Sequence, residues 1–253
     1  AEDRYHDPGT PMLARTASGT WVLRRGEGGR CLYLRGDGAS PEGDRPFLDR
    51  FDLASRRTRR LWRSAAPHYE TVLEILDAER GLLLTRREGV DEPPNCFVRD
   101  LRRGGARAVT RFPHPQPQLR AVRKELLRYR RADGVDLTGT LYWPAAWDST
   151  RDGPLPLLMW AYPQEYASAA AAGQVADSPY RFIRATWSSP VPWVLLGYAV
   201  LDDPSLPIIG EGGAEPNDTY VAQLVAGAQA AVDAVTARGV ADPARLAVGG
   251  HSY

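Results

Sequence analysis

The chain has 253 residues, of which 43% are hydrophobic and 25% are charged, as is ordinary for a globular protein. Its 32 basic and 31 acidic residues leave a formal net charge of +1, so no overall field draws it to nucleic acid or to an anionic membrane. No apolar run approaches the length of a membrane-spanning helix, and we expect no nucleic acid and no membrane among its partners.

Short apolar runs alternate with turn residues over the first 111 residues. Runs of this length, bounded by Gly, Asp, Pro and Arg, favour strands over helices. We expect strands at Thr20–Leu23, Arg30–Leu34, Pro46–Leu53, Thr58–Trp62, Thr71–Leu76, Gly81–Thr85 and Cys96–Leu101. The pattern predicts an all-β part. Blades of a β-propeller and a small β-sandwich both fit it.

Two segments of this all-β part resemble each other. Phe47–Trp62 and Cys96–Thr110 each contain an apolar strand ending in Asp-Leu, a polar turn, and a second strand that mixes basic and apolar residues. This pattern is typical of the two outer strands of a propeller blade. Two copies do not fix a repeat period, so the sandwich remains open at this point.

A proline-rich stretch separates the all-β part from the rest. Phe112–Gln118 has three prolines within five residues, which prevent a helix and remove donors that a sheet would need. We therefore predict an extended linker at residues 112–122, between a β part at 1–111 and a second part at 123–253.

The second part has an α/β pattern. Glu125–Arg131 and Leu137–Trp143 alternate as antiparallel strands do, with a turn at Asp133-Gly134. Leu155–Tyr162 is nearly all apolar, and Trp193–Leu201 contains a second such run. Continuous apolar runs are expected of strands that are covered on both faces.

A helix and another strand follow. Thr219–Arg238 has apolar residues at helical spacing, with Asn217 or Asp218 to cap its start and Gly239 to end it. The apolar face we predict consists of Val221, Leu224, Val225, Ala228, Val232 and Val235. Ala244–Gly249 then forms a short strand that we expect to be buried, which completes a βαβ unit of a parallel sheet.

Gly250-His251-Ser252 matches the first three positions of a Gly-x-Ser-x-Gly nucleophile elbow. In that turn between strand and helix the flanking glycines relieve crowding, and the residue after the serine donates its backbone N–H to an oxyanion. The motif predicts Ser252 as nucleophile and Tyr253 as backbone donor. Gly-x-Ser alone is a short pattern, and a serine in an ordinary loop is the alternative.

None of the four histidines is a good base for Ser252. His251 is its neighbour in sequence, and side chains at such a turn diverge, so we expect His251 to pack or to form a hydrogen bond. His6, His68 and His114 precede the sheet. In sheets that carry a nucleophile elbow, the catalytic triad follows the chain order Ser, Asp, His. We therefore expect the Asp and His of the triad beyond Tyr253.

Tyr162 stands at the end of an apolar strand, directly before Pro163. The carboxyl ends of strands carry function in α/β sheets, and a phenol there can donate to a developing oxyanion. An aromatic residue at the rim of the sheet is the alternative reading of the same position.

Cys31 and Cys96 lie far apart in apolar stretches and show no metal-binding spacing. We expect buried free thiols rather than a disulfide, and no metal site.

Five longer motifs are FPHPQPQL (Phe112–Leu119), YRRADGVDLTGTLYWP (Tyr129–Pro144), PLPLLMWAYPQEY (Pro154–Tyr166), PIIGEGGAEPNDTYVAQLVA (Pro207–Ala226) and RGVADPARLAVGGHSY (Arg238–Tyr253). With them the chain resembles the prolyl oligopeptidase family, and within it the branch of the glutamyl endopeptidases. The resemblance implies the last blades of a β-propeller at 1–111 and the first part of an α/β-hydrolase domain at 123–253. It also implies Ser252 as nucleophile, with Tyr162 and the N–H of Tyr253 as oxyanion donors. In related branches glycines follow that tyrosine, where this chain has Pro163-Gln164.

The activity that the resemblance implies is hydrolysis of peptides through an acyl-enzyme, without metal or organic cofactor and with a suggested preference for glutamyl bonds. We expect these 253 residues alone to be inactive, because they contain no base for Ser252. An esterase on the same fold and a non-catalytic propeller that binds a partner are the alternatives. Neither the cellular compartment nor the oligomeric state follows from the sequence.

Overall fold

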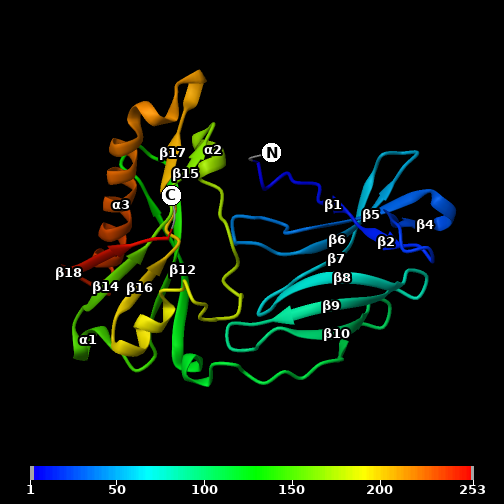
Figure 1. Cartoon of the computed structure of the whole chain (residues 1–253), viewed down its shortest axis with the longest axis horizontal. Helices are drawn as coiled ribbons and strands as arrows, with labels where there is room; N and C mark the ends of the chain where they lie inside the picture. The colour runs from blue at the N-terminus through cyan, green and yellow to red at the C-terminus, as the bar shows by residue number, and fades with distance from the viewer. Residues whose placement is uncertain (1–2, 252–253) are drawn as a thin grey trace. The chain divides into compact units, whose positions relative to one another are not determined.

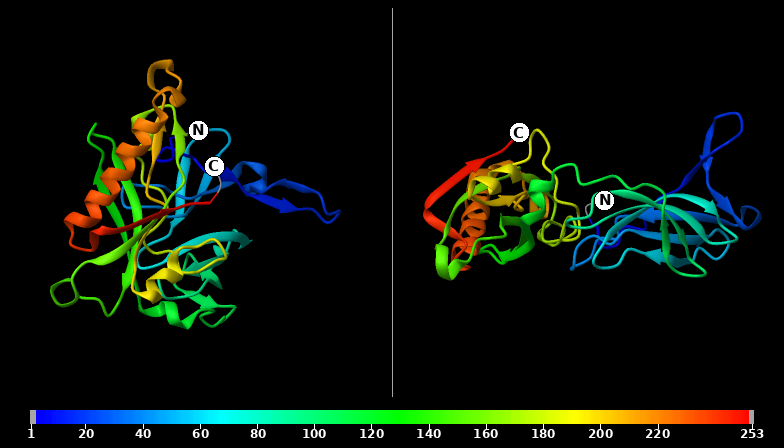
Figure 2. Two further views of the ribbon diagram at one scale, coloured as in Figure 1. Left: turned by 60° about the vertical axis from the view of Figure 1, so that its left-hand side comes forward. Right: turned by 90° about the horizontal axis from the view of Figure 1, so that it is seen from below.

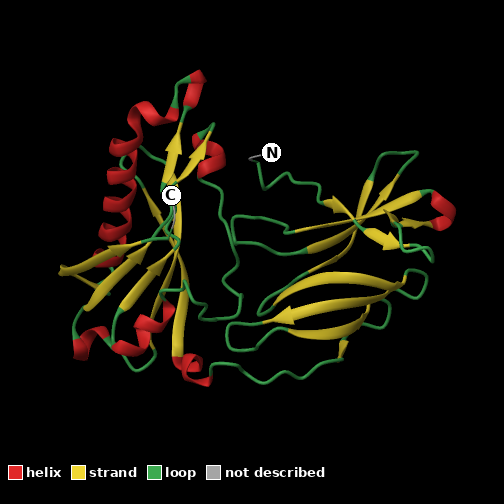
Figure 3. Ribbon diagram, viewed as in Figure 1, coloured by secondary structure: helices red, strands yellow, loops and turns green. Residues whose placement is uncertain are grey.

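The computed structural model describes residues 3–251. The chain divides into two compact units, each described here by itself. The first unit comprises Asp3–Pro115 and Tyr180–Phe182, and the second comprises Gln116–Pro179 and the chain from Ile183 onward (Figure 1). Figure 3 shows that, in the described chain, the first unit is built of strands and loops with one short 3₁₀ turn, whereas the other helical segments belong to the second unit.

The first sheet of the first unit has the order β1-β5-β6-β7, and β4 also pairs with β5. Its strands are β1 (Thr10–Pro11), β4 (Arg25–Gly26), β5 (Cys31–Gly36), β6 (Phe47–Asp52) and β7 (Thr58–Arg63), and the turn η1 (Glu27–Gly29) connects β4 to β5. All of these pairings are antiparallel. The strands therefore form a meander, apart from the excursion between β1 and β4.

The second sheet is a regular antiparallel meander with the order β11-β10-β9-β8. Its strands are β8 (Tyr69–Asp77), β9 (Leu82–Glu88), β10 (Asn95–Asp100) and β11 (Ala106–Ala108). The strand pairs β6–β7 and β10–β11, which come from the two segments that resemble each other, occupy the last two positions of their sheets. The internal likeness in the sequence thus corresponds to equivalent places in the two sheets.

An apolar core joins the two sheets of the first unit. It contains Met12, Cys31, Tyr33, Leu48, Val72, Ile75 and Leu83, each less than 9% exposed. Cys31 and Cys96 are both free, as predicted, although Cys96 is only half-buried. Burial of Cys31 places its thiol among the core side chains, where it packs as a small apolar group.

The excursion after β1 forms a small hairpin of β2 (Leu13–Arg15) and β3 (Trp21–Leu23). Figure 2 shows this hairpin standing away from the rest of the first unit. Its apolar side chains face solvent, and Trp21 is 63% exposed. A strand at Thr20–Leu23 was predicted, but the exposure of its side chains was not.

The three residues Tyr180–Phe182 leave the second unit and pack in the first. Arg181 lies over the ring of Tyr69, with its guanidinium carbon 4.4 Å from the ring centroid, and donates to the phenol oxygen at 3.0 Å. The Phe182 N–H donates to the buried carboxylate of Glu88 at 3.3 Å. No sequence pattern pointed to this excursion.

The second unit is organised around a mixed five-stranded sheet with the order β12-β13-β16-β14-β18. Its strands are β12 (Val122–Arg130), β13 (Asp136–Pro144), β14 (Leu155–Trp160), β16 (Ala199–Asp202) and β18 (Ala241–Gly249). The pairings β12–β13 and β13–β16 are antiparallel, and β14 runs parallel to both β16 and β18. The predicted turn at Asp133-Gly134 joins β12 to β13, and Gly134 has the left-handed φ of +93° that favours glycine there.

The helix α3 (Tyr220–Ala237) covers one face of this sheet (Figure 1). The predicted helix was right within one residue at each end, but part of the predicted face was wrong. Val221 and Val225 are 71% and 61% exposed, and the fully buried positions of α3 are Gly227, Ala231 and Val235. Small residues form the buried stripe because the helix lies close to the segment beneath it. A Cβ at Gly227 would come within 3.1 Å of the Leu206 side chain.

The predicted end of α3 is correct, whereas the predicted N-cap is wrong. The N-cap is Thr219, and neither Asn217 nor Asp218 caps the helix, because both lie in the preceding 3₁₀ turn η5 (Pro216–Thr219). At the other end, Gly239 follows the C-cap with a φ of +71° and ends the helix as predicted.

Strand β18 was predicted to be buried, and this was wrong. It lies at the edge of the sheet, pairs only with β14 among the described strands, and is exposed over most of its length, with Val248 71% exposed. The apolar pattern correctly indicated a strand but not what covers it. The run at Trp193–Leu201 also divides, into the 3₁₀ helix η3 (Val191–Leu196) and β16, with Gly197 at φ +88° between them.

The remaining elements of the second unit are short. They are the helices α1 (Ser149–Asp152) and α2 (Ala169–Ala172), the 3₁₀ turns η2 (Pro117–Ala121) and η4 (Glu211–Gly213), and the strands β15 (Gln164–Tyr166) and β17 (Pro207–Ile209). Strands β15 and β17 form a separate parallel pair. Within residues 3–251, no helix has both the length and the apolar character needed to cross a membrane.

Candidate active site

The candidate site lies where the adjacent parallel strands β14 and β18 end. Their register places Trp160 opposite Gly249, and the Ala161 N–H donates to the Gly249 carbonyl at 3.0 Å. Because the strands are parallel, their carboxyl ends reach the same edge of the sheet, where α/β proteins hold their ligands. Tyr162 follows the end of β14 by two residues, and Ser252 follows the end of β18 by three.

Two consecutive glycines let the chain after β18 pass close to β14. A Cβ at Gly249 would lie 2.7 Å from the Trp160 ring, and one at Gly250 would lie 2.5 Å from the Ala161 carbonyl oxygen. The second neighbour is backbone and has no rotamer through which it can move away. Gly250 is the first glycine of the Gly-x-Ser motif, so the packing supplies a physical reason for glycine at that position.

Ser252 and Tyr253, predicted as nucleophile and backbone oxyanion donor, lie outside the described residues. His251 is described, and its exposed ring meets Trp187 edge-on, with 5.1 Å between ring centroids. This contact agrees with the prediction that His251 packs against a neighbour. The other three histidines each have an acidic neighbour within the first unit: Asp3 for His6, Glu92 for His68 and Asp91 for His114.

Tyr162 is at the edge of the sheet where the sequence predicted it, and 42% of the residue is exposed. It lines a pocket of about 400 Å³ together with Pro163, Gln164, Glu165, Ile208 and Tyr220. The phenol is therefore open to solvent beside a hollow. That placement suits a donor that meets a substrate oxygen.

Tyr162 also lines a second pocket, of about 260 Å³, whose wall includes Asp177, Asp202 and Asp203. Burial, with the nearby charge of Asp203 second, raises the pKa of Asp202 to about 6. The pKa of Asp203, whose residue is exposed, is also raised, first by partial desolvation of its carboxyl and then by the charge of Asp177. This pocket therefore changes its charge in mildly acidic solution.

Lys124, which is the single lysine in the sequence, lies near these carboxylates. Its side chain is only 2% exposed, and its ammonium group donates to the Ser178 carbonyl at 3.2 Å and lies 4.0 Å from the Asp177 carboxylate. Sequence reasoning did not single out any of these residues. The available signal was Leu201-Asp202-Asp203-Pro204, in which one acid ends a buried strand and a second directly follows it. Among the described residues, no group of three or more His, Cys, Asp and Glu side chains is placed to hold a metal ion.

Two curated plant proteins are similar to this chain along its whole length. The probable chloroplastic glutamyl endopeptidase of Oryza sativa subsp. japonica is 45% identical over 265 residues, covering 100% of this chain and 28% of that protein. The protein of the same name from Arabidopsis thaliana is 45% identical over 266 residues, with the same coverage. The chain belongs to the prolyl oligopeptidase family. This member of the family spans 28% of the length of these two relatives.

Several solved structures of peptidases have a fold similar to that of this chain. The AtxE2 isopeptidase has a TM-score of 0.58 at 19% identity, covering 95% of this chain and 37% of its own. Oligopeptidase B from Trypanosoma brucei has a TM-score of 0.55 at 16% identity, covering 97% and 32%. A post-proline cleaving enzyme from Rickettsia typhi has 0.52 at 15% identity, covering 88% and 30%. No family model matches the chain.

Proposed function

We propose that this chain contributes the nucleophile and the oxyanion donors of a serine peptidase. The observation that carries the proposal is the meeting of β14 and β18 at one edge of the sheet. There Gly250 packs against the Ala161 carbonyl, one residue before Tyr162. This packing holds Gly250, the first residue of the Gly-x-Ser motif, against the residue that precedes Tyr162. The similarity to curated glutamyl endopeptidases supports the same assignment.

In the proposed mechanism the Ser252 hydroxyl attacks the carbonyl carbon of a peptide bond as a general base takes its proton. The Tyr162 hydroxyl and the Tyr253 N–H donate to the oxygen that becomes negative. The tetrahedral intermediate collapses, the amine leaves with the proton from the base, and water hydrolyses the acyl-enzyme. The base is a histidine held by an aspartate, and we propose that both belong to a part of the protein outside these 253 residues.

We also propose domain identities for the two parts of the chain. Residues 1–111 would be blades of a β-propeller, since the two larger sheets of the first unit each contain a four-stranded antiparallel path. Residues 123–253 would be the first part of an α/β-hydrolase domain, with 112–122 as the linker. Peptides are the proposed substrates, and a preference for glutamyl bonds is proposed from the names of the curated relatives.

The test is a hydrolysis assay with the full-length gene product. The panel consists of peptides that differ only in Glu, Gln, Pro or Lys before the scissile bond, and one ester of the same acyl group. We expect cleavage after Glu by the wild type and none by Ser252→Ala. Cleavage of the ester alone would replace the peptidase proposal with an esterase. Equal rates for Glu and Gln would remove the glutamyl preference and leave the peptidase proposal standing.

A further inference from the structure

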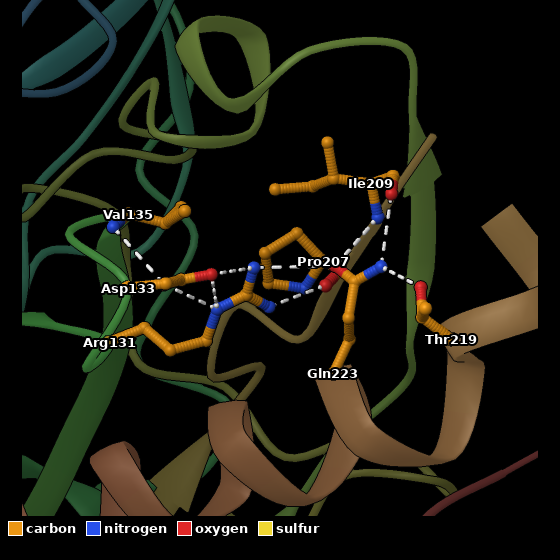
Figure 4. Close-up of polar contacts among 7 residues, drawn as sticks. All are labelled: Arg131, Asp133, Val135, Pro207, Ile209, Thr219 and Gln223. Atoms are coloured by element: carbon orange, nitrogen blue, oxygen red, sulfur yellow. Dashed lines mark hydrogen bonds and ion pairs between the residues drawn. The ribbon is translucent and has the colours of Figure 1, made fainter. Parts of the chain in front are cut away.

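Gln223, on the first turn of α3, binds both backbone groups of one residue in β17 (Figure 4). Its Nε2 donates to the Ile209 carbonyl at 3.0 Å, and its Oε1 accepts from the Ile209 N–H at 2.9 Å. The same Nε2 donates to the Thr219 hydroxyl at 2.8 Å. One side chain therefore ties the end of β17 to the start of α3.

Arg131 supports Gln223 from the turn after β12 (Figure 4). Its side chain is only 3% exposed, and its guanidinium donates to the Gln223 Oε1 at 3.3 Å and to the Pro207 carbonyl at 3.0 Å. The Asp133 carboxylate lies 2.8 Å from the same group, and that hydrogen bond lowers the pKa of Asp133. An arginine remains charged, so these acceptors offset the free energy that its burial costs.

The backbone that these two side chains hold lies beside Tyr162. Strand β17 pairs in parallel with β15, which begins two residues after Tyr162. In addition, the Gln164 N–H donates to the Leu206 carbonyl at 3.2 Å. Ile208 and Tyr220 form part of the wall of the 400 Å³ pocket, and Gln223 binds their sequence neighbours, Ile209 and Thr219.

A two-stranded sheet of this size does not hold its own position. Strands β15 and β17 have three residues each, and an isolated pair of strands is marginal in water. Apolar packing of Tyr166 and Ile209 against Val135 and Leu137 attaches the pair to the larger sheet. That packing is not directional. The amide of Gln223 binds both the N–H and the C=O of Ile209, and thereby fixes the position of Ile209 relative to the start of α3.

We propose that Gln223 and Arg131 are positioning residues for Tyr162. They hold β17 and the start of α3 in place. Because β17 pairs with β15, they also hold β15, which begins two residues after Tyr162. The inference rests on the proposed function, since it needs Tyr162 to donate to the oxyanion. It adds two residues that touch no substrate and act through the placement of another side chain.

The experiment uses the full-length protein and the substitutions Gln223→Ala, Tyr162→Phe and the two together. The matched control is Gln229→Ala, because Gln229 is exposed on the same helix and donates to Asp233 on the helix surface at 2.7 Å. The rate of peptide hydrolysis is divided by the number of active serines, counted by titration with a fluorophosphonate. A role confined to stability lowers that count and leaves the rate per active serine unchanged.

We expect Gln223→Ala to lower kcat per active serine about 10-fold to 100-fold, because a displacement of about 1 Å at a catalytic group has an effect of that size. The double variant should be no slower than Tyr162→Phe alone, since both changes remove the same interaction. Gln223→Glu keeps the acceptor for Ile209 and Arg131 and loses the donor, so its rate should lie between those of Gln223→Ala and the wild type. Gln229→Ala should match the wild type.

Two results would overturn the inference in different ways. If Tyr162→Phe lowers the rate and Gln223→Ala multiplies that loss or has no effect per active serine, Gln223 does not act through Tyr162. The proposed function then stands without it. If Tyr162→Phe leaves the rate unchanged, the oxyanion role of Tyr162 fails and the positioning role fails with it. Labelling of Ser252 reports on the peptidase proposal separately.

Discussion

The carbonyl oxygen of Ala161 lies 2.5 Å from the point where a side chain at Gly250 would begin. This closeness ties the end of β14, which leads to Tyr162, to the end of β18, which leads to Ser252. The glycine is thus required by packing between two strand ends, in addition to any strain in the turn itself.

Gly250→Ala should therefore damage the site more than a typical glycine substitution does. Its methyl group would have to push backbone apart, which costs about 1 to 3 kcal/mol of unfolding free energy. A shift of about 1 Å between the two strand ends should lower the rate of peptide hydrolysis about 100-fold. Gly89→Ala is the control, since its new methyl group would meet its nearest neighbours at 3.6 Å. Equal rates for the two variants would show that the close contact has no role in the site.

Tyr162→Phe should lower kcat with little change in KM. The hydroxyl is proposed to donate to an oxyanion that exists only in the transition state, so its loss leaves substrate binding intact. Removal of one oxyanion donor elsewhere costs about 100-fold to 1,000-fold in kcat. Steady-state kinetics on the full-length protein measure both constants. A higher KM at unchanged kcat would place Tyr162 in substrate binding instead.

Asp202 should make the protein less stable as the pH rises from about 4 to about 6. Burial raises the pKa of its carboxyl to about 6 in the folded protein, so the folded state binds the proton more tightly than the unfolded state does. Stability is then highest below the unfolded pKa and falls as the pH rises through the folded pKa. The loss amounts to roughly 3 kcal/mol at neutral pH.

Asp202→Asn should remove this slope, because the amide does not titrate. Urea unfolding of the full-length protein at pH 4, 5, 6 and 7 measures it. Asp148→Asn serves as a control that should keep the wild-type slope, since hydrogen bonds from Thr150 lower the pKa of that exposed carboxyl and it titrates below the pH range measured. If Asp202→Asn also keeps the wild-type slope over this range, some other group causes it.

The first unit contains a buried ion pair whose removal should be costly. The Glu70 side chain is 4% exposed and accepts from Arg99 at 2.6 and 2.9 Å and from the Thr85 hydroxyl at 2.5 Å. Arg99→Ala leaves this carboxylate buried without its cation, which costs about 3 to 5 kcal/mol. Arg130→Ala removes an exposed pair with Asp136 and should cost less than about 1 kcal/mol. Guanidinium unfolding compares the two, and equal losses would contradict the role of burial.

The pattern of apolar residues predicted most strands of both units and the extent of α3. Alternation and apolar runs are local, and each strand at Phe47–Asp52, Thr58–Arg63 and Leu155–Trp160 carries its own signal. The exposure of β18 was not predictable in this way, because an apolar run does not reveal whether a neighbouring element covers it. The sequence correctly predicted Val235 in the buried stripe of α3 but missed Gly227 and Ala231, because glycine and alanine, which permit close packing, look unremarkable beside valine.

The sequence placed Tyr162 and the Gly-x-Ser motif at strand ends, since a strand and the residues directly after it are consecutive. It did not reveal the second pocket, whose Asp177 and Asp202 are 25 residues apart in the chain. Nor did it reveal Arg131 and Gln223, which are 92 residues apart and meet only when β12 and α3 are in place. Contacts of this kind depend on the packing of elements and leave no local trace.

The most direct test of the account is to find which residue of the full-length protein reacts with a fluorophosphonate. Such a probe modifies a serine only where a base and an oxyanion site activate it. The account predicts one modified peptide carrying the adduct on Ser252, lost in Ser252→Ala and strongly slowed in Gly250→Ala. An adduct on another serine, or none in a folded protein, would contradict the assignment of the nucleophile and with it the proposed peptidase.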